Sequence, residues 1–197
     1  MYNQTNEKNI KTSIFNIIDS VILSESQRED EFYKKISEWC GYNRMELIYR
    51  GTRDGMNSNG FHTKCDYQGP TITLYKNDKG NIFGGYSPIQ WTSDGAYHAA
   101  PEAFIFTLIN IYNTEPTKFN TKSSSEGVYH SKDYGPTFGS YCDIGIASDF
   151  VNSDSNSDFP CRYQDTLGKG KSIFTGNFDN NKPNFRLKEI EVFKLLK

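Results

Sequence analysis

The residue pattern changes character at Gly41, and this change constrains the fold more than any other feature of the sequence. Before Gly41, apolar residues recur with helical spacing, first from Ile14 to Ile22 and then at Phe32, Ile36 and Trp39. After it, short apolar runs are separated by Gly, Asn and Pro, which is typical of strands joined by turns. The sequence therefore predicts an α+β chain, in which two N-terminal helices flank a two-sheet antiparallel β-sandwich.

The second helix has recognisable signals at both ends. Ser26 and Glu29 form a capping-box pattern at its start, and Gly41 suits a left-handed cap at its end. Glu31 and Lys35 are four residues apart, where opposite charges attract on a helix surface. We therefore expect a helix that begins near Ser26 and ends at Gly41.

A β-hairpin is the clearest local signal. Residues 71–75 alternate and are β-branched, residues 77–80 suit a turn, and residues 81–86 return. Gly84 and Gly85 inside the return strand indicate either a bulge or a close neighbour.

The rest of the chain is expected to add short strands and loops. Residues 61–65 fit either a helix or a strand, and the alternating run 103–108 favours a strand. Loops are expected at residues 113–125 and 148–160. The remaining strands are expected at 45–50, 128–129, 143–147, 172–175 and 186–194, with a turn at 53–55.

Composition limits the class of protein. The chain has 197 residues, enough for one large domain with its own core, and its 13 Tyr and 14 Phe argue against disorder. A net charge of -2 forces no basic face, so nucleic acid is an unfavoured partner. No apolar run reaches the length of a membrane-spanning helix, and Asn16 and Asp19 interrupt the only stretch that resembles a signal peptide. We therefore expect a cytoplasmic protein whose four cysteines are reduced and mostly buried, with a disulfide or redox pair as the less favoured alternative.

Metal-binding patterns are weak in this sequence. His62 and Cys65 have the spacing of one zinc ligand pair, but no second pair follows, and His98 and His130 stand alone. Asp154, Asn156 and Asp158 imitate the first half of a calcium loop that then lacks its Gly and its Glu, which favours a solvated loop. We expect no metal and no cofactor, and the sequence makes no prediction about a small-molecule ligand.

Catalytic patterns are equally weak. There is no nucleophile-elbow motif, and the Gly-Lys-Ser triplet at residues 170–172 lacks the upstream glycine of a phosphate-binding loop. Cys65 is interpreted as a buried thiol, and Trp91 as a core anchor beneath a loop, with aromatic recognition as the less favoured alternative. The sequence therefore leans away from an enzyme.

Six segments taken in order resemble a known family, the TLDc domain. They read LIYRGTRDG (47–55), FHTKCDYQGPTITLYK (61–76), GNIFGGYSPIQW (80–91), EAFIFTLIN (102–110), YGPTFGS (134–140) with DIGIA (143–147), and KEIEVF (188–193). The resemblance runs from about Ser20 to Phe193. It divides the chain into an N-terminal helical extension, residues 1–19, and one TLDc-like domain, residues 20–197.

The resemblance implies a fold and a function. TLDc domains are antiparallel β-sandwiches with flanking helices, and members are not established enzymes. Several bind the V-ATPase and modulate its activity or assembly, and others are linked to oxidative-stress resistance. It thus implies a regulatory module for V-ATPase peripheral subunits, recruited to endolysosomal or vacuolar membranes. The alternatives are a hydrolase or thiol-redox enzyme, and a lineage-specific module for another protein, nucleic acid or a membrane surface.

The chain departs from the family pattern in two respects. It carries no LysM, GAP-like or EF-hand partner domain, and residues 138–142 stand where many members have a run of glycines. The first departure argues against a membrane-anchored role, and the second argues against a function that depends on the glycine loop.

The family motifs also supply the candidate site residues. Arg53 is expected to pair with a carboxylate such as Asp66 or Asp143, and Gly55 to supply unusual backbone geometry. Glu189 and Glu191 alternate along the last strand, as either a solvated face or an acidic strip that a partner recognises. The full candidate set is Arg50, Arg53, Asp54, Gly55, His62, Cys65, Asp66, Gly84, Gly85, Trp91, Gly139, Asp143, Glu189 and Glu191.

Overall fold

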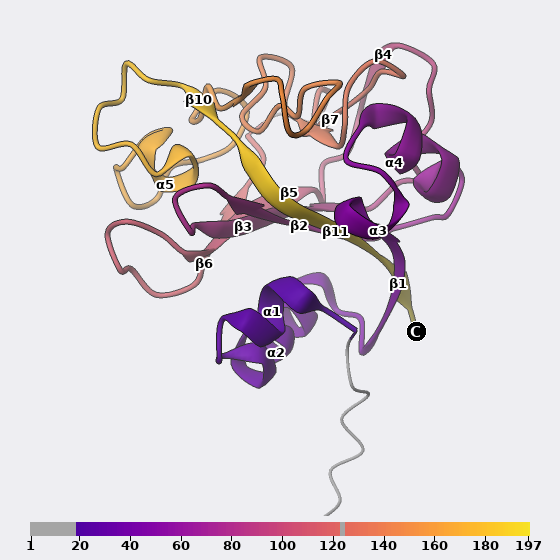
Figure 1. The fold of residues 1–197 in the computed structure, drawn as a ribbon, viewed down its shortest axis with the longest axis horizontal. Helices are drawn as coiled ribbons and strands as arrows, with labels where there is room; N and C mark the ends of the chain where they lie inside the picture. The colour runs from indigo at the N-terminus through magenta and orange to yellow at the C-terminus, as the bar shows by residue number, and fades with distance from the viewer. Residues whose placement is uncertain (1–18, 123–124) are drawn as a thin grey trace, which may run out of the picture.

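A six-stranded antiparallel sheet runs through the centre of the molecule (Figure 1). The computed structural model describes residues 19–122 and 125–197. The strand order is β1-β11-β2-β3-β5-β6, so the C-terminal strand lies between the first two strands of the chain. The strands are β1 (Arg44–Arg50), β2 (Thr71–Asn77), β3 (Ile82–Ser87), β5 (Phe104–Ile109), β6 (Thr117–Asn120) and β11 (Leu187–Leu196).

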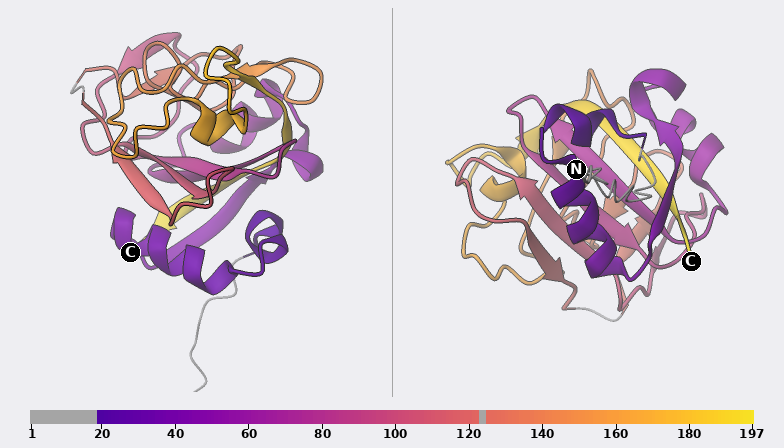
Figure 2. Two further views of the ribbon diagram at one scale, coloured as in Figure 1. Left: turned by 90° about the vertical axis from the view of Figure 1, so that its left-hand side faces the viewer. Right: turned by 90° about the horizontal axis from the view of Figure 1, so that it is seen from below.

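Two helices cover one face of this sheet (Figure 2). They are α1 (Val21–Glu25) and α2 (Glu29–Cys40), and their buried side chains share a hydrophobic cluster with Phe106 and Phe193 of the sheet. The Trp39 ring packs 5.6 Å from the Phe106 ring, between centroids. The apolar stripe predicted from Phe32, Ile36 and Trp39 is therefore the face that the sheet buries.

Smaller elements cover the opposite face. A three-stranded sheet in the order β4-β7-β8 and a two-stranded sheet of β9 and β10 lie there with three short helices (Figures 1 and 2). Together with the central sheet they make the predicted α+β sandwich. The bounds are β4 (Ala96–His98), β7 (Val128–His130), β8 (Thr137–Phe138), β9 (Ser155–Asn156), β10 (Asn184–Phe185), α3 (Gly51–Asp54), α4 (Ser58–Cys65) and α5 (Ser172–Thr175).

The predicted hairpin is present as β2 and β3, with an unbroken register from Thr71 opposite Ser87 to Lys76 opposite Ile82. The two glycines of β3 have close neighbours, which was one of the two expected explanations. A Cβ on Gly84 would lie 2.5 Å from Cζ of Phe106, and one on Gly85 would lie 2.4 Å from Cζ of Phe138. The glycines therefore let aromatic rings pack directly on the sheet backbone.

The N-terminal predictions hold only in part. Residues 14–18 and most of the predicted extension 1–19 lie outside the described residues, and α1 begins at Val21. Ser26 does not cap α2, because α2 begins three residues later at Glu29 and Ser26 is the C-cap of α1, where its hydroxyl donates to the Leu23 carbonyl at 2.5 Å and accepts from the Arg28 N–H at 3.1 Å. Arg28 precedes α2 without a side-chain cap. Gly41 has φ 74° and ends α2 in the left-handed conformation, as predicted.

The predicted attraction between Glu31 and Lys35 on α2 is present, but Arg28 makes the direct contact with Glu31. Glu31 accepts from Nε of Arg28 at 2.8 Å, one turn earlier, and Lys35 pairs with Glu38. Arg28 immediately precedes the helix, and its side chain reaches forward by one turn to the Glu31 carboxylate.

Six other predicted segments are resolved or corrected by the structure. Residues 172–175 form α5 and not a strand, because short apolar runs do not separate helix from strand and this one is buried among aromatic rings. Residues 143–147 form isolated bridges only, and residues 53–55 end the short helix α3. Residues 61–65 are helical, and β6 and β9 lie within the two predicted loops.

Among the described residues no helix has the length and apolarity needed to span a membrane.

Candidate functional site

Glu191 of β11 joins the two ends of the described chain. Its side chain is fully buried, and its carboxylate accepts from Ser20 Oγ at 2.6 Å and from the backbone N–H of Val21 at 3.0 Å. Arg50 of β1 donates to it through Nε at 2.8 Å and reaches Asp19 Oδ1 through Nη2 at 2.8 Å. Glu191 is therefore neither solvated nor open to a partner, contrary to both expectations.

Glu189 has a parallel role two residues earlier. It is 7% exposed, and its carboxylate accepts from the backbone N–H of Thr52 at 3.1 Å, from the Thr52 hydroxyl and from its own neighbour Ile190 N at 2.9 Å. The two carboxylates of β11 are thus engaged by α1 and α3, and they form neither a solvated face nor an acidic strip open to a partner. The reason is that β11 is an inner strand, and both of its faces are covered.

The turn after β1 is organised by Asp54. Asp54 accepts from the backbone N–H of Arg50 at 2.9 Å and from Arg53 Nη2 at 2.7 Å. The hydrogen bond from Arg53 lowers the pKa of the Asp54 carboxyl. Arg53 therefore pairs with its neighbour Asp54 and not with Asp66 or Asp143. Both residues lie in the short helix α3, where the Arg53 side chain points toward Asp54. Gly55 has φ 111°, the unusual geometry expected of it.

Asp143 anchors a loop. Its buried carboxylate accepts from the backbone N–H groups of Cys161 and Arg162, each at 2.7 Å, and of Tyr163 at 3.3 Å. Burial raises the pKa of Asp143. Gly139 has φ 82°, and a Cβ there would lie 2.2 Å from Asp143 Oδ2. Gly139 is therefore required for the approach of this carboxylate.

The four cysteines are free thiols with poor conditions for ionisation. Burial raises the pKa of each of them, Cys40, Cys65, Cys142 and Cys161. Cys65 is fully buried in the core beside Phe61 and Trp91. A thiolate is the reactive form of cysteine, so this environment disfavours nucleophilic or redox chemistry at neutral pH.

His62 of α4 holds a loop by hydrogen bonds from both ring nitrogens. Nε2 faces the carbonyl oxygens of Ser131 at 2.9 Å and Tyr134 at 3.0 Å, so it carries a proton. Nδ1 lies 2.8 Å from Asp66 Oδ1 and 3.2 Å from Ser93 Oγ. Ser93 and Asp66 face the same nitrogen, which is not the order of a catalytic triad, where they flank opposite nitrogens.

The other two histidines lie together on β4 and β7. Their rings stack with centroids 4.1 Å apart, and His98 Nε2 lies 2.9 Å from Asp94 Oδ2. The hydrogen bond from His98 lowers the pKa of Asp94 to about 2. Burial, followed by the charge of His98, lowers the pKa of His130 to about 4. We call Asp94, His98 and His130 the histidine cluster.

Trp91 lies next to this cluster in the core. Its ring is 5.1 Å from that of His130 and 5.7 Å from that of Phe138, between centroids, and its Nε1 donates to Thr71 Oγ1 at 2.9 Å. The indole is buried, so it supports the loop that carries the histidine cluster and does not face solvent.

The outer face of the same two strands carries tyrosines. Tyr97 and Tyr129 are directly paired in the register and stack with centroids 4.5 Å apart, and Tyr134 lies 6.4 Å from Tyr129. Tyr97 and Tyr134 are each 48% exposed. We call Tyr97, Tyr129 and Tyr134 the tyrosine face.

The histidine cluster and the tyrosine face were not predicted, although one sequence signal points to both. The dipeptide Tyr-His occurs at residues 97–98 and again at 129–130. Alternation along paired strands sends each Tyr to one face and each His to the other.

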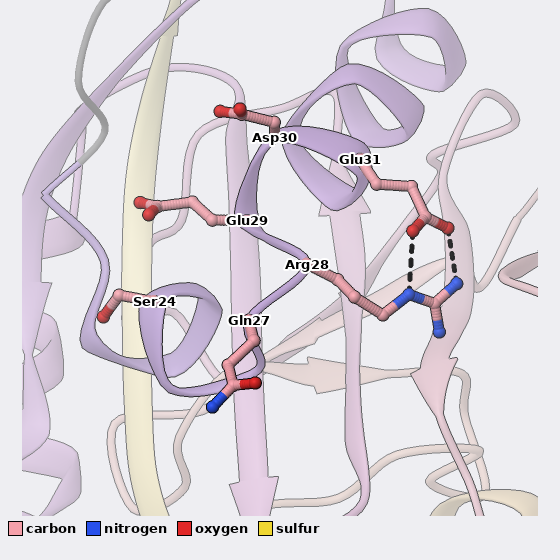
Figure 3. A pocket seen from close by; sticks show the side chains of 6 residues that line it. All are labelled: Ser24, Gln27, Arg28, Glu29, Asp30 and Glu31. Carbon is pink, nitrogen blue, oxygen red and sulfur yellow. Dashed lines mark hydrogen bonds and ion pairs between the residues drawn. The ribbon is translucent and has the colours of Figure 1, made fainter.

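A surface hollow of about 440 Å³ lies at the α1–α2 turn (Figure 3). In Figure 3, Arg28 and Glu31 pair across one side, while Glu29 and Asp30 extend from the first turn of α2. Its lining residues are Ser24, Gln27, Arg28, Glu29, Asp30 and Glu31.

The carboxylates of the suspected calcium loop are paired with cations. Asp154 accepts from Arg186 Nε and Asp158 from Lys171 Nζ, each at 3.0 Å. These two side chains therefore fasten the loop to the residues that follow it.

Comparison with known proteins gives one result. A family model described as the TLDc domain matches residues 17–196, nearly the whole chain. The search of curated proteins found no match.

Proposed function

The chain belongs to the TLDc domain family, and we propose that it is a non-catalytic protein-interaction module that binds peripheral subunits of the V-ATPase. The observation that carries this proposal is the family match over residues 17–196. Binding to the pump would recruit the protein from the cytoplasm to endolysosomal or vacuolar membranes. We assign any link with oxidative-stress resistance to this binding and not to the thiols.

The tyrosine face supports a protein partner. Tyr97 and Tyr134 expose about half of their surface while their rings stay ordered by neighbouring aromatic side chains. Tyrosine contributes apolar area and a hydroxyl with few rotatable bonds, which is why it is enriched at protein interfaces. The hydroxyl of Tyr97 donates to the Ser140 carbonyl at 3.0 Å, which orients the ring before any partner arrives.

The enzyme alternative receives less support from the contacts. Such an enzyme could use the thiol of Cys65 or Cys142 as its nucleophile, but burial raises the pKa of both thiols. The candidate carboxylates Asp143, Glu189 and Glu191 are engaged by backbone and side-chain donors. These contacts are structural in kind, and they favour an interaction module.

A pull-down from lysate of the source organism tests the proposal. The bait is the full chain, the control is the heat-denatured chain, and mass spectrometry identifies bound proteins. We expect the peripheral subunits of the V-ATPase above the control. A folded bait that recovers none of them would overturn the proposal.

The double variant Tyr97→Ala with Tyr129→Ala tests the tyrosine face. We expect recovery to fall at least about tenfold, because tyrosine is enriched among the few interface residues whose truncation costs about 2 kcal/mol or more. Phe178→Ala is the matched control, since Phe178 is 71% exposed in the segment between α5 and β10. In Figure 1, α5 and β10 lie on the opposite side of the molecule from β4. Full recovery by the double variant would leave pump binding intact and exclude this face.

A further inference from the structure

The histidine cluster has the composition of a metal site. We propose that Asp94, His98 and His130 bind a divalent transition-metal ion of the zinc class. One donor atom from each residue lies within 4.8 Å of the other two. Two imidazole nitrogens and one carboxylate oxygen form a ligand set that zinc uses where three protein ligands leave a fourth position open.

The spacing of Asp94 and His98 already suits an ion. His98 Nε2 lies 2.9 Å and 3.1 Å from the two oxygens of Asp94. Adjacent ligands of a tetrahedral zinc ion are about 3.3 Å apart, given bonds of about 2.0–2.1 Å. An ion can therefore replace the hydrogen bond between these side chains, together with a rotation of the His98 ring. The side chains of His98 and Asp94 are 31% and 45% exposed, which gives the ion access from solvent.

An independent observation comes from His130. Its ring is 1% exposed, and Nε2 has no hydrogen-bond partner among the described residues. A buried polar atom without a partner is unfavourable and calls for an explanation. The other nitrogen, Nδ1, lies 3.0 Å from Thr92 Oγ1. If Nδ1 donates to Thr92, the lone pair of Nε2 is free, which is how an outer hydrogen bond prepares a histidine for a metal.

The fold brings the three residues together through backbone contacts. In the antiparallel pair of β4 and β7, Ala96 lies opposite His130, so His98 and His130 are diagonal neighbours on one face. The Gly95 N–H donates to the His130 carbonyl at 2.7 Å and holds the preceding turn against β7. Asp94 is oriented by the Ala96 N–H, which donates to Oδ1 at 3.0 Å.

Binding requires one rearrangement. The two imidazole rings are inclined by only 28°, and a metal lies in the plane of each ligating ring. One ring must therefore turn out of the stack. His98 is the ring that can turn, because it is the more exposed and, within the described part of the chain, its side-chain hydrogen bonds go to Asp94 alone. The ion would then tie β4, β7 and the loop before β4 together.

Titration of the tag-free full chain with Co²⁺, followed by competition with Zn²⁺, tests the site. We expect one equivalent to bind with micromolar affinity or better, with cobalt absorption bands but no thiolate charge-transfer band. We expect His98→Gln and Asp94→Asn each to weaken binding at least about 100-fold. Thr92→Val should weaken it about tenfold, as loss of an outer-shell partner does.

His62→Gln is the matched control, because His62 is the remaining histidine and is engaged by Asp66 and two carbonyl groups. It should bind as tightly as the original chain. Zinc-induced shifts of the imidazole nitrogens in NMR spectra of the unmutated chain provide a measurement that does not depend on variant folding. They should move for His98 and His130 and stay for His62. Absence of one-equivalent binding, a thiolate band, or equal binding by His98→Gln would overturn the proposal.

Discussion

Glu191 shows how a carboxylate survives in the core of this molecule. A buried charge is tolerated where donors surround it, and Glu191 receives them from Ser20, Val21 and Arg50. Asp143 follows the same rule with three backbone N–H groups. At the scale of single residues, these polar side chains of the family motifs therefore hold separate segments of the chain together by hydrogen bonds.

Removing the Glu191 carboxylate should cost much more stability than removing an exposed one. Glu191→Ala leaves Nε of Arg50, the Ser20 hydroxyl and the N–H of Val21 without their acceptor, and we expect a loss of about 3–5 kcal/mol in the free energy of unfolding. Urea denaturation followed by circular dichroism measures it. Glu46→Ala, at an exposed position of β1, should stay within about 0.5 kcal/mol of the original. Similar losses in the two variants would contradict the role given to Glu191.

The thiols should react slowly at neutral pH. Burial raises the pKa of all four cysteines, which lowers the fraction of thiolate below that of a free thiol. We expect each to be alkylated by iodoacetamide more slowly than glutathione, with rates that increase as the pH is raised. Mass spectrometry of timed samples gives the rates, and the urea-unfolded chain is the control. A cysteine that reacts faster than glutathione would revive the thiol-enzyme alternative.

The elements follow local sequence signals where these are strong and tertiary packing where they are weak. The hairpin β2–β3 formed as predicted, because it combines periodicity with a turn. The helix α2 ends at Gly41 as predicted but begins at Glu29, because its periodicity and its C-terminal glycine are clear and its start lacks a side-chain cap. The run 172–175 became α5 because its Phe174 ring packs 5.4 Å from Phe83 and 5.0 Å from Phe159, between centroids. A four-residue run has too little periodicity to choose by itself.

The Phe138 ring of β8 packs on the central sheet at Gly85 of β3, where the absence of a side chain leaves room for it. In Gly85→Ala the new Cβ would lie 2.4 Å from the Phe138 ring, and we expect a loss of about 1–3 kcal/mol in the free energy of unfolding. Phe138→Leu removes part of that ring and should relieve the clash. A double-mutant cycle by urea denaturation should therefore give a favourable coupling of at least about 0.5 kcal/mol. Strict additivity would contradict the proposed contact.

At the scale of the whole molecule, the last strand completes the sheet. β11 pairs with β1 on one side and β2 on the other, and Glu191 reaches Ser20 across 171 residues. The sheet therefore cannot close until the C-terminal strand is in place, and such long-range pairing slows folding.

Deletion of residues 187–197 should abolish the fold. It separates β1 from β2, exposes two strand edges and removes the partners of α1 and α3. We expect loss of the cooperative thermal transition and an aggregated or expanded chain in size-exclusion chromatography. Deletion of the exposed Lys197 alone should leave both measurements unchanged. A cooperative transition in the longer deletion would contradict the central place of β11.

The sequence by itself determined the α+β class, the helix α2, the hairpin and the family resemblance. These depend on periodicity, turn residues and motifs that are local in the chain, so they can be recognised without coordinates. Burial and pairing are not determined by such local signals, and the repeated Tyr-His dipeptide does not by itself show that its two strands pair. Only the tertiary structure decided that Glu189 and Glu191 are buried and that His98 and His130 meet beside Asp94. It also decided that Arg53 pairs with its neighbour Asp54 and not with a distant carboxylate. The physical reason is that burial and pairing depend on which strands become neighbours, and β11 acquires its neighbours only when the sheet closes around it.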